Sequence, residues 1–533
     1  MLAAFALLVL PASAQTGLRP QAATHAPQNL CVRDVLLAPG DDGERATLLL
    51  SGGRIEARLA ADAPTPKGYA VIEGEGRLLL PAFVDAFTTR GVSAPPASQD
   101  RTGDGPHVQD ARADVLADMR PALRRGLRPS FRAVDVAELS TEHLDAWRAA
   151  GFGYALQSPA GELLSGRGAL VSLRDGALRD RVVVAEAAMH ASFSSSGGGY
   201  PSTLMGRFAH LRQFALDAGH WAELEQRRTE GRPGPRPPYD PDLVVGAELA
   251  RGELSVLCAA DRAADVRRWL RFAQELGWRV VILGGAESGE LAPRLAGGSV
   301  PVVLTLEWGD EPDDPRKVKP KGKRSASAKS DDSAGDEDPG ESEESEDAEE
   351  SEDSEDAEDA EDSDAATPEG EEGAQAAQTS AAPAEDSAEA RLAPYAEPYA
   401  VRLDRRLEWE QRRDSALVLA RADAPFAFGS AAESPGELLG RVRKLVEAGL
   451  PRDAALAALT RGAAGILAGN APGDVPRGSL AAGAPASFAL WSADPLTDKK
   501  ARVVWMFVEG HGWQAPPAKD AVKKDGESKG DAR

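Results

Sequence analysis

The feature that most constrains this chain is a repeated alternation of short apolar runs and helix-like segments through its middle. The strand-like runs cover residues 153–156, 169–173, 254–258, 279–283, 301–306 and 426–428. Helical patterns fill many of the intervals, among them residues 263–276, 415–422, 436–448 and 452–459. Strands that alternate with helices form parallel sheets, because each crossover returns the chain to the same end of the sheet. At 533 residues the pattern predicts an α/β fold, a (β/α)8 TIM-like barrel with additions.

Both ends of the chain have a different pattern, short strands separated by turns. The N-terminal candidates are residues 32–37, 47–50, 53–56, 69–72 and 78–80. The C-terminal candidates are residues 478–491 and 503–510. The pair Gly52-Gly53 favours a hairpin turn. Because hairpins with modest apolar content need a partner sheet, we expect the two ends to form one small β-sandwich beside the barrel.

A long charged segment interrupts the second half of the alternation. Residues 316–329 are basic, and residues 331–390 hold 27 Asp or Glu and no Lys or Arg. Such a composition buries too little apolar surface to offset chain entropy, so we expect this insertion to be disordered. The net charge of −24 belongs to the insertion, since removing its −27 leaves +3. The rest of the chain is nearly neutral, and nothing in it indicates nucleic acid as a partner.

Residues 1–14 have the pattern of an export signal. An apolar run over residues 2–10 is followed by the small residues Ala12-Ser13-Ala14, a usual cleavage context. The run is too short to span a bilayer, and no other segment reaches spanning length. We therefore expect a periplasmic or secreted protein with no membrane span. Residues 15–31 are expected to be a flexible lead-in, and residues 514–533 a disordered tail.

One local motif indicates a family. The run Arg77-Leu-Leu-Leu-Pro-Ala-Phe-Val84 has the composition of a buried strand and is followed by Asp85-Ala-Phe-Thr-Thr89. Together they resemble the first barrel strand of the metal-dependent amidohydrolases, where the family writes Pro-Gly-Phe-x-Asp-x-His-x-His. Members of that superfamily hydrolyse C–N bonds other than peptide bonds, so the resemblance implies a barrel of this kind and, in a typical member, that activity.

The resemblance extends over most of the chain outside the insertion. Residues 478–510 are similar to the family's closing strands, and residues 449–467 to its last barrel helices. The segment Gly199-Tyr-Pro-Ser-Thr-Leu-Met-Gly206 is similar to one in exported imidazolonepropionase-like members, and this resemblance implies that it shapes the pocket. The boundaries that we expect are 32–80 and 474–513 for the β-sandwich, 81–308 and 391–473 for the barrel, and 309–390 for the insertion.

The resemblance also assigns positions for metal ligands. It implies ligands from the His-x-His motif, a lysine or glutamate on a middle strand, histidines at the ends of strands 5 and 6, and an aspartate after strand 8. In this chain Phe87 and Thr89 replace the histidines of the motif, and Ala431 replaces the aspartate. No histidine lies between His220 and His511, so the middle pair has no match in any register. We expect no metal ligands at these positions and no cofactor.

A different site could use the polar residues that the sequence places near the barrel mouth. Asp85, Thr89, His190 and Glu433 are weak catalytic candidates. Together with Glu307 and Asp310, the acidic residues among them could instead hold a hard cation such as calcium or magnesium, although solvated loop acids are common on any barrel face. Residues 189–206 predict a glycine-rich loop that opens a helix at Ser202, whose N–H groups could bind an anion. Cys258 lies in an apolar run and is expected to be a buried core residue.

Three functional hypotheses follow from these features. In the first, the chain is an exported amidohydrolase-fold protein without metal catalysis, which binds a small molecule or partners an active paralogue. In the second, it is an active C–N hydrolase with an atypical site at the four candidates named above. In the third, the acidic arm at 331–390 is the functional part and responds to cations.

Overall fold

The computed structural model describes residues 19–20, 29–37, 43–93, 125–194, 201–317, 397–467 and 478–515. The predicted export signal, the acidic run 331–390 and most of the predicted tail lie outside the described residues. The chain divides into one compact unit of residues 1–313 and 403–533, and a second of residues 314–402. The second unit is described only at 314–317 and 397–402, and the fold below is that of the first.

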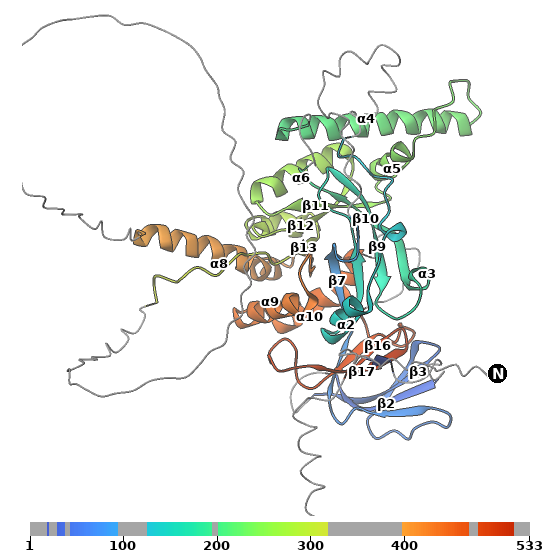
Figure 1. Ribbon diagram of the computed structural model, residues 1–533, viewed down its shortest axis with the longest axis vertical. Coiled ribbons are helices and arrows are strands. Elements are labelled where there is room, and N and C mark those ends of the chain that lie inside the picture. Colours follow the sequence, from blue (N-terminus) through green and yellow to red (C-terminus); the bar gives the residue numbers. More distant parts are fainter. Residues whose placement is uncertain are drawn as a thin grey trace, which may run out of the picture. The chain divides into compact units, whose positions relative to one another are not determined.

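Eight strands form a nearly closed barrel in sequence order (Figure 1). They are β7 (Phe83–Thr88), β8 (Phe152–Gln157), β9 (Leu164–Ser172), β10 (Val182–Ala191), β11 (Ser255–Ala260), β12 (Arg279–Gly284), β13 (Val302–Leu304) and β14 (Phe426–Phe428). The first and last strands meet at a parallel bridge between Thr88 and Ala431. The segment after β14 therefore closes the sheet onto the end of β7.

The barrel departs from the predicted (β/α)8 pattern in one sector. Strand β9 runs antiparallel to both β8 and β10, whereas the other neighbouring pairs are parallel. Only residues 158–163 connect β8 to β9, and a parallel pair needs a crossover of about a dozen residues or more. Strand β10 was missing from the predicted strands, which jumped from 169–173 to 254–258. The barrel was therefore correctly expected, but its regular alternation fails between β8 and β10.

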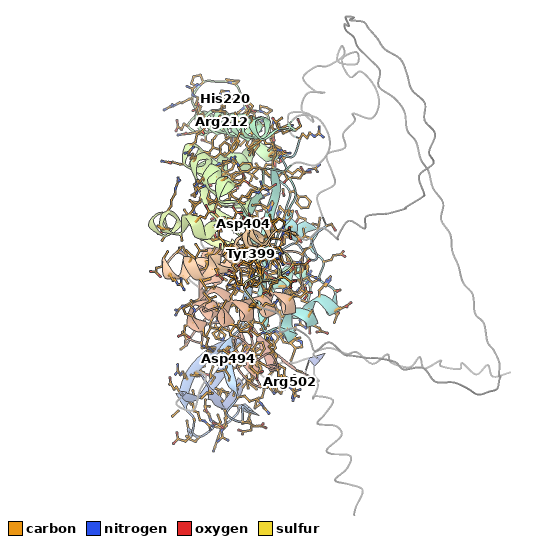
Figure 2. The ribbon with its side chains drawn as sticks, turned by 90° about the vertical axis from the view of Figure 1, so that its left-hand side faces the viewer. Arg212, His220, Tyr399, Asp404, Asp494 and Arg502 are labelled. Carbon is orange, nitrogen blue, oxygen red and sulfur yellow. The ribbon has the colours of Figure 1, made fainter. Side chains whose placement is uncertain are left out.

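Helices lie between the strands in the sequence and after the last of them. They are α2 (Thr141–Ala149), α3 (Leu178–Arg181), α4 (Leu204–Thr229), α5 (Pro241–Ala250), α6 (Ala263–Leu276), α7 (Ala292–Gly297), α8 (Tyr399–Arg421), α9 (Pro435–Glu447), α10 (Arg452–Leu459) and α11 (Arg461–Leu467), with short 3-10 turns η2 (Ala133–Asp135) and η3 (Ser288–Leu291). The predictions for α6 and α10 match their bounds, while α8 begins at Tyr399, well before the expected 415. In Figure 2, Arg212 and His220 mark the long helix α4. No helix among the described ranges is long and apolar enough to cross a membrane.

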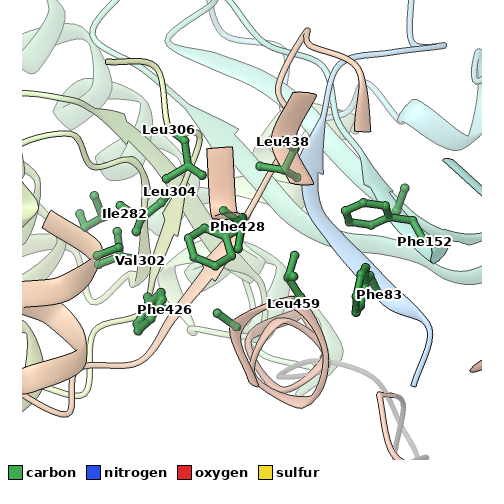
Figure 3. Packing of buried hydrophobic residues seen from close by; sticks show 14 of the residues in the cluster. Phe83, Phe152, Ile282, Val302, Leu304, Leu306, Phe426, Phe428, Leu438 and Leu459 are labelled. Atoms are coloured by element: carbon green, nitrogen blue, oxygen red, sulfur yellow. The ribbon is translucent and has the colours of Figure 1, made fainter. Parts of the chain in front are cut away.

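The two faces of the barrel wall contribute to different cores. Val256 and Ile282 face outward and belong to the core that the surrounding helices cover, shown in part in Figure 3. The alternate residues form a second core to which each of the eight strands contributes, for example Val84, Tyr154, Leu170, Ala188, Leu257, Val281, Val303 and Ala427. Side chains alternate between the faces of a strand, so this second core is the barrel interior. The interior is filled by apolar side chains.

The two ends of the unit join in one nine-stranded sheet. Its strands are β1 (Arg19–Pro20), β2 (Asn29–Leu36), β3 (Arg45–Ser51), β4 (Arg54–Ala60), β5 (Ala70–Glu73), β6 (Leu78–Pro81), β15 (Phe488–Trp491), β16 (Val503–Val508) and β17 (His511–Gln514). The halves meet where β6 pairs antiparallel with β15, with Leu80 opposite Ala489. Leu48 and Leu79 share a core with Phe488 and Phe507, so strands from both halves cover the same apolar face. The predicted association of the two ends is therefore present as one sheet, and its classification as a small β-sandwich stays a prediction.

The predicted hairpin at Gly52-Gly53 is also confirmed. The two glycines connect β3 to β4, with Ser51 opposite Arg54. Their φ angles are 56° and 76°, in the left-handed region that a two-residue type I′ turn requires at both central positions.

Candidate functional site

The three positions that the family resemblance assigns to metal ligands lie together at the barrel mouth. The Ala431 N–H donates to the Phe87 carbonyl at 3.0 Å, and the Thr89 N–H donates to the Ala431 carbonyl at 3.0 Å. The Thr88 hydroxyl also donates to the Ala431 carbonyl, at 3.0 Å. The ends of β7 and β14 are therefore joined by direct hydrogen bonds at the place where the resemblance puts a metal centre.

Phe87 brings an aromatic ring to the first of these positions. Its side chain is 4% exposed and belongs to the apolar barrel interior. It stacks on the His190 ring with centroids 5.8 Å apart and an interplanar angle of 23°. Such a contact is a stabilising aromatic pair. An imidazole at position 87 would offer a ligand nitrogen, whereas the phenyl ring offers none.

His190 lies on β10 and is buried. Its Nδ1 lies 2.9 Å from the Ser165 hydroxyl, which also interacts with the backbone of Glu162. Burial lowers the pKa of His190 to about 4. At neutral pH the imidazole is therefore uncharged, with one nitrogen bound to a serine that its own loop holds in place.

Asp85 lies below the mouth and is fully buried. Its Oδ1 accepts the N–H groups of Phe87, at 3.3 Å, and Ser430, at 2.9 Å. Its Oδ2 accepts the Trp147 indole N–H at 3.0 Å and the Ser430 hydroxyl at 2.6 Å. Burial raises the pKa of Asp85 to about 6 despite these four donors. The carboxylate joins β7, α2 and the segment after β14, which is a structural arrangement.

Thr89 and Glu433 have partners of their own. The Thr89 hydroxyl donates to the Ala431 carbonyl at 3.4 Å. The Glu433 carboxylate pairs with Arg441, which also donates to the Leu306 carbonyl at 2.6 Å. The structure thus places Asp85, Thr89 and Glu433 at one mouth of the barrel. The polar groups of each are engaged in hydrogen bonds or ion pairs with other residues of the fold.

The donor set at this mouth does not fit the family's metal centre. Phe87 and Ala431 have no ligand atom, and the inward positions on β11 and β12 include Leu257, Val281 and Leu283. Glu307 follows β13, and partial desolvation together with the carboxylates of Asp261 and Glu433 raises its pKa. Within the described ranges, no group of three or more His, Cys, Asp or Glu side chains is placed to hold a metal ion.

The structure corrects the prediction for residues 189–206 and confirms the one for Cys258. Met189 and His190 lie in strand β10 rather than in a glycine-rich loop, because their run pairs with both β9 and β11. The following helix begins at Leu204 with Thr203 as its N-cap, not at Ser202, and residues 195–200 lie outside the described residues. Cys258 is fully buried and free, as expected of a core residue, and burial raises the pKa of its thiol well above the usual value.

Three residues of the mouth were absent from the sequence-based candidates. Trp147 and Ser430 supply three of the four hydrogen bonds to Asp85, and Ser165 orients His190. Ser430 precedes Ala431 in the sequence, and this position next to a predicted ligand was the one sequence signal that could have identified it as a site residue. Trp147 and Ser165 sit in ordinary helical and strand sequence and had no local signal.

Comparison with known proteins identifies the fold. An amidohydrolase from Thermotoga maritima superposes with a TM-score of 0.60 at 16% identity, covering 91% of this chain and 99% of the other. A prolidase complexed with N-methylphosphonate-L-proline reaches a TM-score of 0.45 at 14% identity, covering 91% and 99%. A 5-methylcytosine deaminase from Klebsiella pneumoniae reaches 0.39 at 11%, covering 91% and 97%. No family model matches the sequence, and no curated protein matches it. At these identities the first likeness establishes the fold alone, and the predicted amidohydrolase fold is confirmed.

Proposed function

We propose that this chain, which has the amidohydrolase fold, is a binding protein that has lost the metal-dependent hydrolysis typical of that fold. The observation that carries the proposal is the Phe87 ring, which occupies the first expected ligand position and stacks on His190 in an apolar barrel interior. A phenyl ring there removes a ligand and adds packing. The partner that we propose is a small molecule or an active protein of the same fold.

The residue types at the mouth support this proposal. Hydrolysis in this fold depends on a divalent metal that polarises a carbonyl and lowers the pKa of bound water. Zinc needs three or four nitrogen, sulfur or carboxylate ligands. Phe87 and Ala431 provide none, and the Thr89 hydroxyl is a donor to a backbone carbonyl. No reaction step through a metal follows from these residues.

The alternative of a hydrolase with an atypical site gains less support from the geometry. A general base must be within hydrogen-bond reach of the proton that it removes. The Asp85 carboxylate already accepts four hydrogen bonds from within the fold, and Glu433 pairs with Arg441. His190 is buried against Phe87.

We also propose that the protein is exported, on the strength of residues 1–14 alone. An exported binding protein needs no catalytic cofactor, and the two proposals are compatible. N-terminal sequencing of the protein recovered from a host periplasm tests this part, since export predicts a mature chain that begins at or near Gln15.

The proposed loss of hydrolysis is tested by turnover. Purified full-length mature protein is assayed on a panel of amides, lactams, cyclic imides and aminopyrimidines, with added Zn²⁺ or Mn²⁺ and without. We expect no turnover above that of the matched His190→Ala and Asp85→Asn variants. Turnover by the unmodified chain that either substitution abolishes would overturn the proposal and favour the atypical site.

A further inference from the structure

An open pocket of about 510 Å3 lies at the N-terminal end of helix α2. Its lining residues are Ala137, Glu138, Leu139, Ser140, His143 and Arg181. Ser140 is the N-cap of α2, and its hydroxyl accepts the His143 N–H at 3.2 Å. Arg181 reaches the same cavity from helix α3, directly before β10. Two segments that lie apart in the sequence therefore border this open pocket.

Arg181 is the unusual member of this set. Only 5% of the residue is exposed, yet its Nε and Nη1 have no hydrogen-bond partner among the described residues. His143 adds a second buried nitrogen, Nδ1, that also lacks a partner there. A buried guanidinium without an acceptor is costly, because desolvation of the charge is not offset. Buried arginines are therefore normally paired.

The nearby acids are already engaged. Asp175 accepts Arg148 on Oδ1 at 2.8 Å and the Trp513 indole on Oδ2 at 3.0 Å. Glu509 pairs with Arg174 at 3.0 Å. The carboxylate of Glu138 lines the cavity on an exposed residue and forms no ion pair with Arg181 among the described residues. Burial and the charge of Arg148 lower the pKa of Arg181, the Asp175 carboxylate raises it, and Arg174 lowers it further. The net direction is downward, so the one acid that acts on Arg181 does not offset the desolvation of its charge.

We propose that this cavity is a binding site for a small organic carboxylate, with Arg181 as the charge partner and His143 as a second contact. Arginine is the side chain best suited to carboxylates. The first turn of a helix also favours an anion. The cavity is much larger than a bare inorganic ion, so the favoured ligand carries an organic body. The site is independent of the proposed loss of hydrolysis, since it shares no residue with the barrel mouth.

Calorimetric titration of the full-length mature protein tests this site. The probes are sodium benzoate, sodium malonate and sodium phosphate at constant ionic strength. We expect saturable binding of at least one carboxylate. The Arg181→Met variant, which keeps an unbranched side chain and removes the charge, should lower that affinity at least tenfold. The matched control is Arg179→Met, on the same short helix, whose side chain is 87% exposed and whose loss should leave affinity unchanged.

The titration results distinguish a carboxylate site at Arg181 from the alternatives. Because Arg181→Met removes an unpaired buried charge, it should fold at least as stably as the parent chain, which keeps the test interpretable. Absence of saturable carboxylate binding, or binding that survives Arg181→Met, overturns the proposal. Phosphate binding that exceeds carboxylate binding overturns the ligand assignment. None of these results depends on hydrolytic turnover, so failure here is distinguishable from failure of the proposed function.

Discussion

Ser430 donates two hydrogen bonds to Asp85, one from its N–H at 2.9 Å and one from its hydroxyl at 2.6 Å. These bonds connect the segment after the last barrel strand to the first strand, across 345 positions of sequence. They complete the barrel beside the parallel bridge between Thr88 and Ala431. The Asp85 carboxylate therefore contributes to the closure of the barrel.

Asp85→Ala should therefore destabilise the protein strongly. The substitution leaves four buried donors without an acceptor, and each unsatisfied group costs about 1–3 kcal/mol before relaxation. We expect a loss of about 3–5 kcal/mol in the free energy of unfolding, measured by urea denaturation. Ser430→Ala removes only the hydroxyl donor and should cost about 1–2 kcal/mol. Equal effects of the two substitutions would contradict the four-donor arrangement.

The pH dependence of stability should reveal two opposing groups. The raised pKa of Asp85, about 6, means that the native state binds this proton more tightly than the unfolded state. The stabilisation that Asp85 contributes to the native state is therefore fully present below pH 4 and is lost as the pH rises to 6. The lowered pKa of His190, about 4, acts in the opposite direction, so its contribution is present above pH 6.5 and is lost as pH falls. Each amounts to about 3 kcal/mol, so they largely cancel between pH 4 and 6.

Single substitutions should break this cancellation. In Asp85→Asn, stability should fall more steeply than in the parent chain between pH 6 and pH 4. In His190→Gln, it should fall less or rise over the same interval. Urea denaturation at pH 4, 5, 6 and 7 measures both slopes, and the double variant is the control. Parallel profiles for all four proteins would show that the two groups titrate normally.

Phe87→Ala should cost about 3–5 kcal/mol, the range for deleting a buried phenyl ring and leaving a cavity. The ring contacts His190 and lies within the barrel interior. Thr89→Val is the matched control on the same strand end, because it removes only a 3.4 Å hydrogen bond from a partly exposed residue. It should cost less than about 1 kcal/mol. Guanidinium denaturation distinguishes the two, and a small cost for Phe87→Ala would mean that the ring is not packed as described.

Gly151→Ala tests the contact between the barrel and the C-terminal strands. Gly151 has a φ of 80°, and an added Cβ would collide with the Trp491 ring of β15. Gly161 has a φ of 99° but open space around an added Cβ, so Gly161→Ala carries only the conformational cost of about 1–2 kcal/mol. Gly151→Ala should lose about 1–3 kcal/mol more, from overpacking. Equal losses in thermal or urea unfolding would place Trp491 elsewhere.

The sequence allowed some of this architecture to be anticipated. The strands at both ends could be predicted because alternation and glycine turns are local signals, and α6 because Val266, Trp269 and Ala273 recur at helical spacing and are buried. The direction of β9 could not, because a strand covered on both faces has the same apolar run in either orientation. Strand β10 carries Val182-Val-Val-Ala-Glu-Ala-Ala, whose alanines weaken the strand pattern.

The candidate site was only partly predictable, for a similar reason. The convergence of Phe87, Thr89 and Ala431 followed from a family motif with fixed positions on the barrel. The partners of Asp85 and the isolation of Arg181 depend on contacts between distant segments. Arg181 lies in a run with four other charged residues between 174 and 180, which has the pattern of a solvated turn rather than of a buried cation.

The metal content of the mature protein shows whether the barrel mouth holds a catalytic metal. It is determined by plasma mass spectrometry after dialysis against buffer that contains trace metals. We expect zinc, manganese, iron and nickel well below one equivalent per chain, because Phe87 and Ala431 offer no ligand atoms. One or two equivalents of a transition metal, retained through dialysis and lost on denaturation, would contradict this expectation.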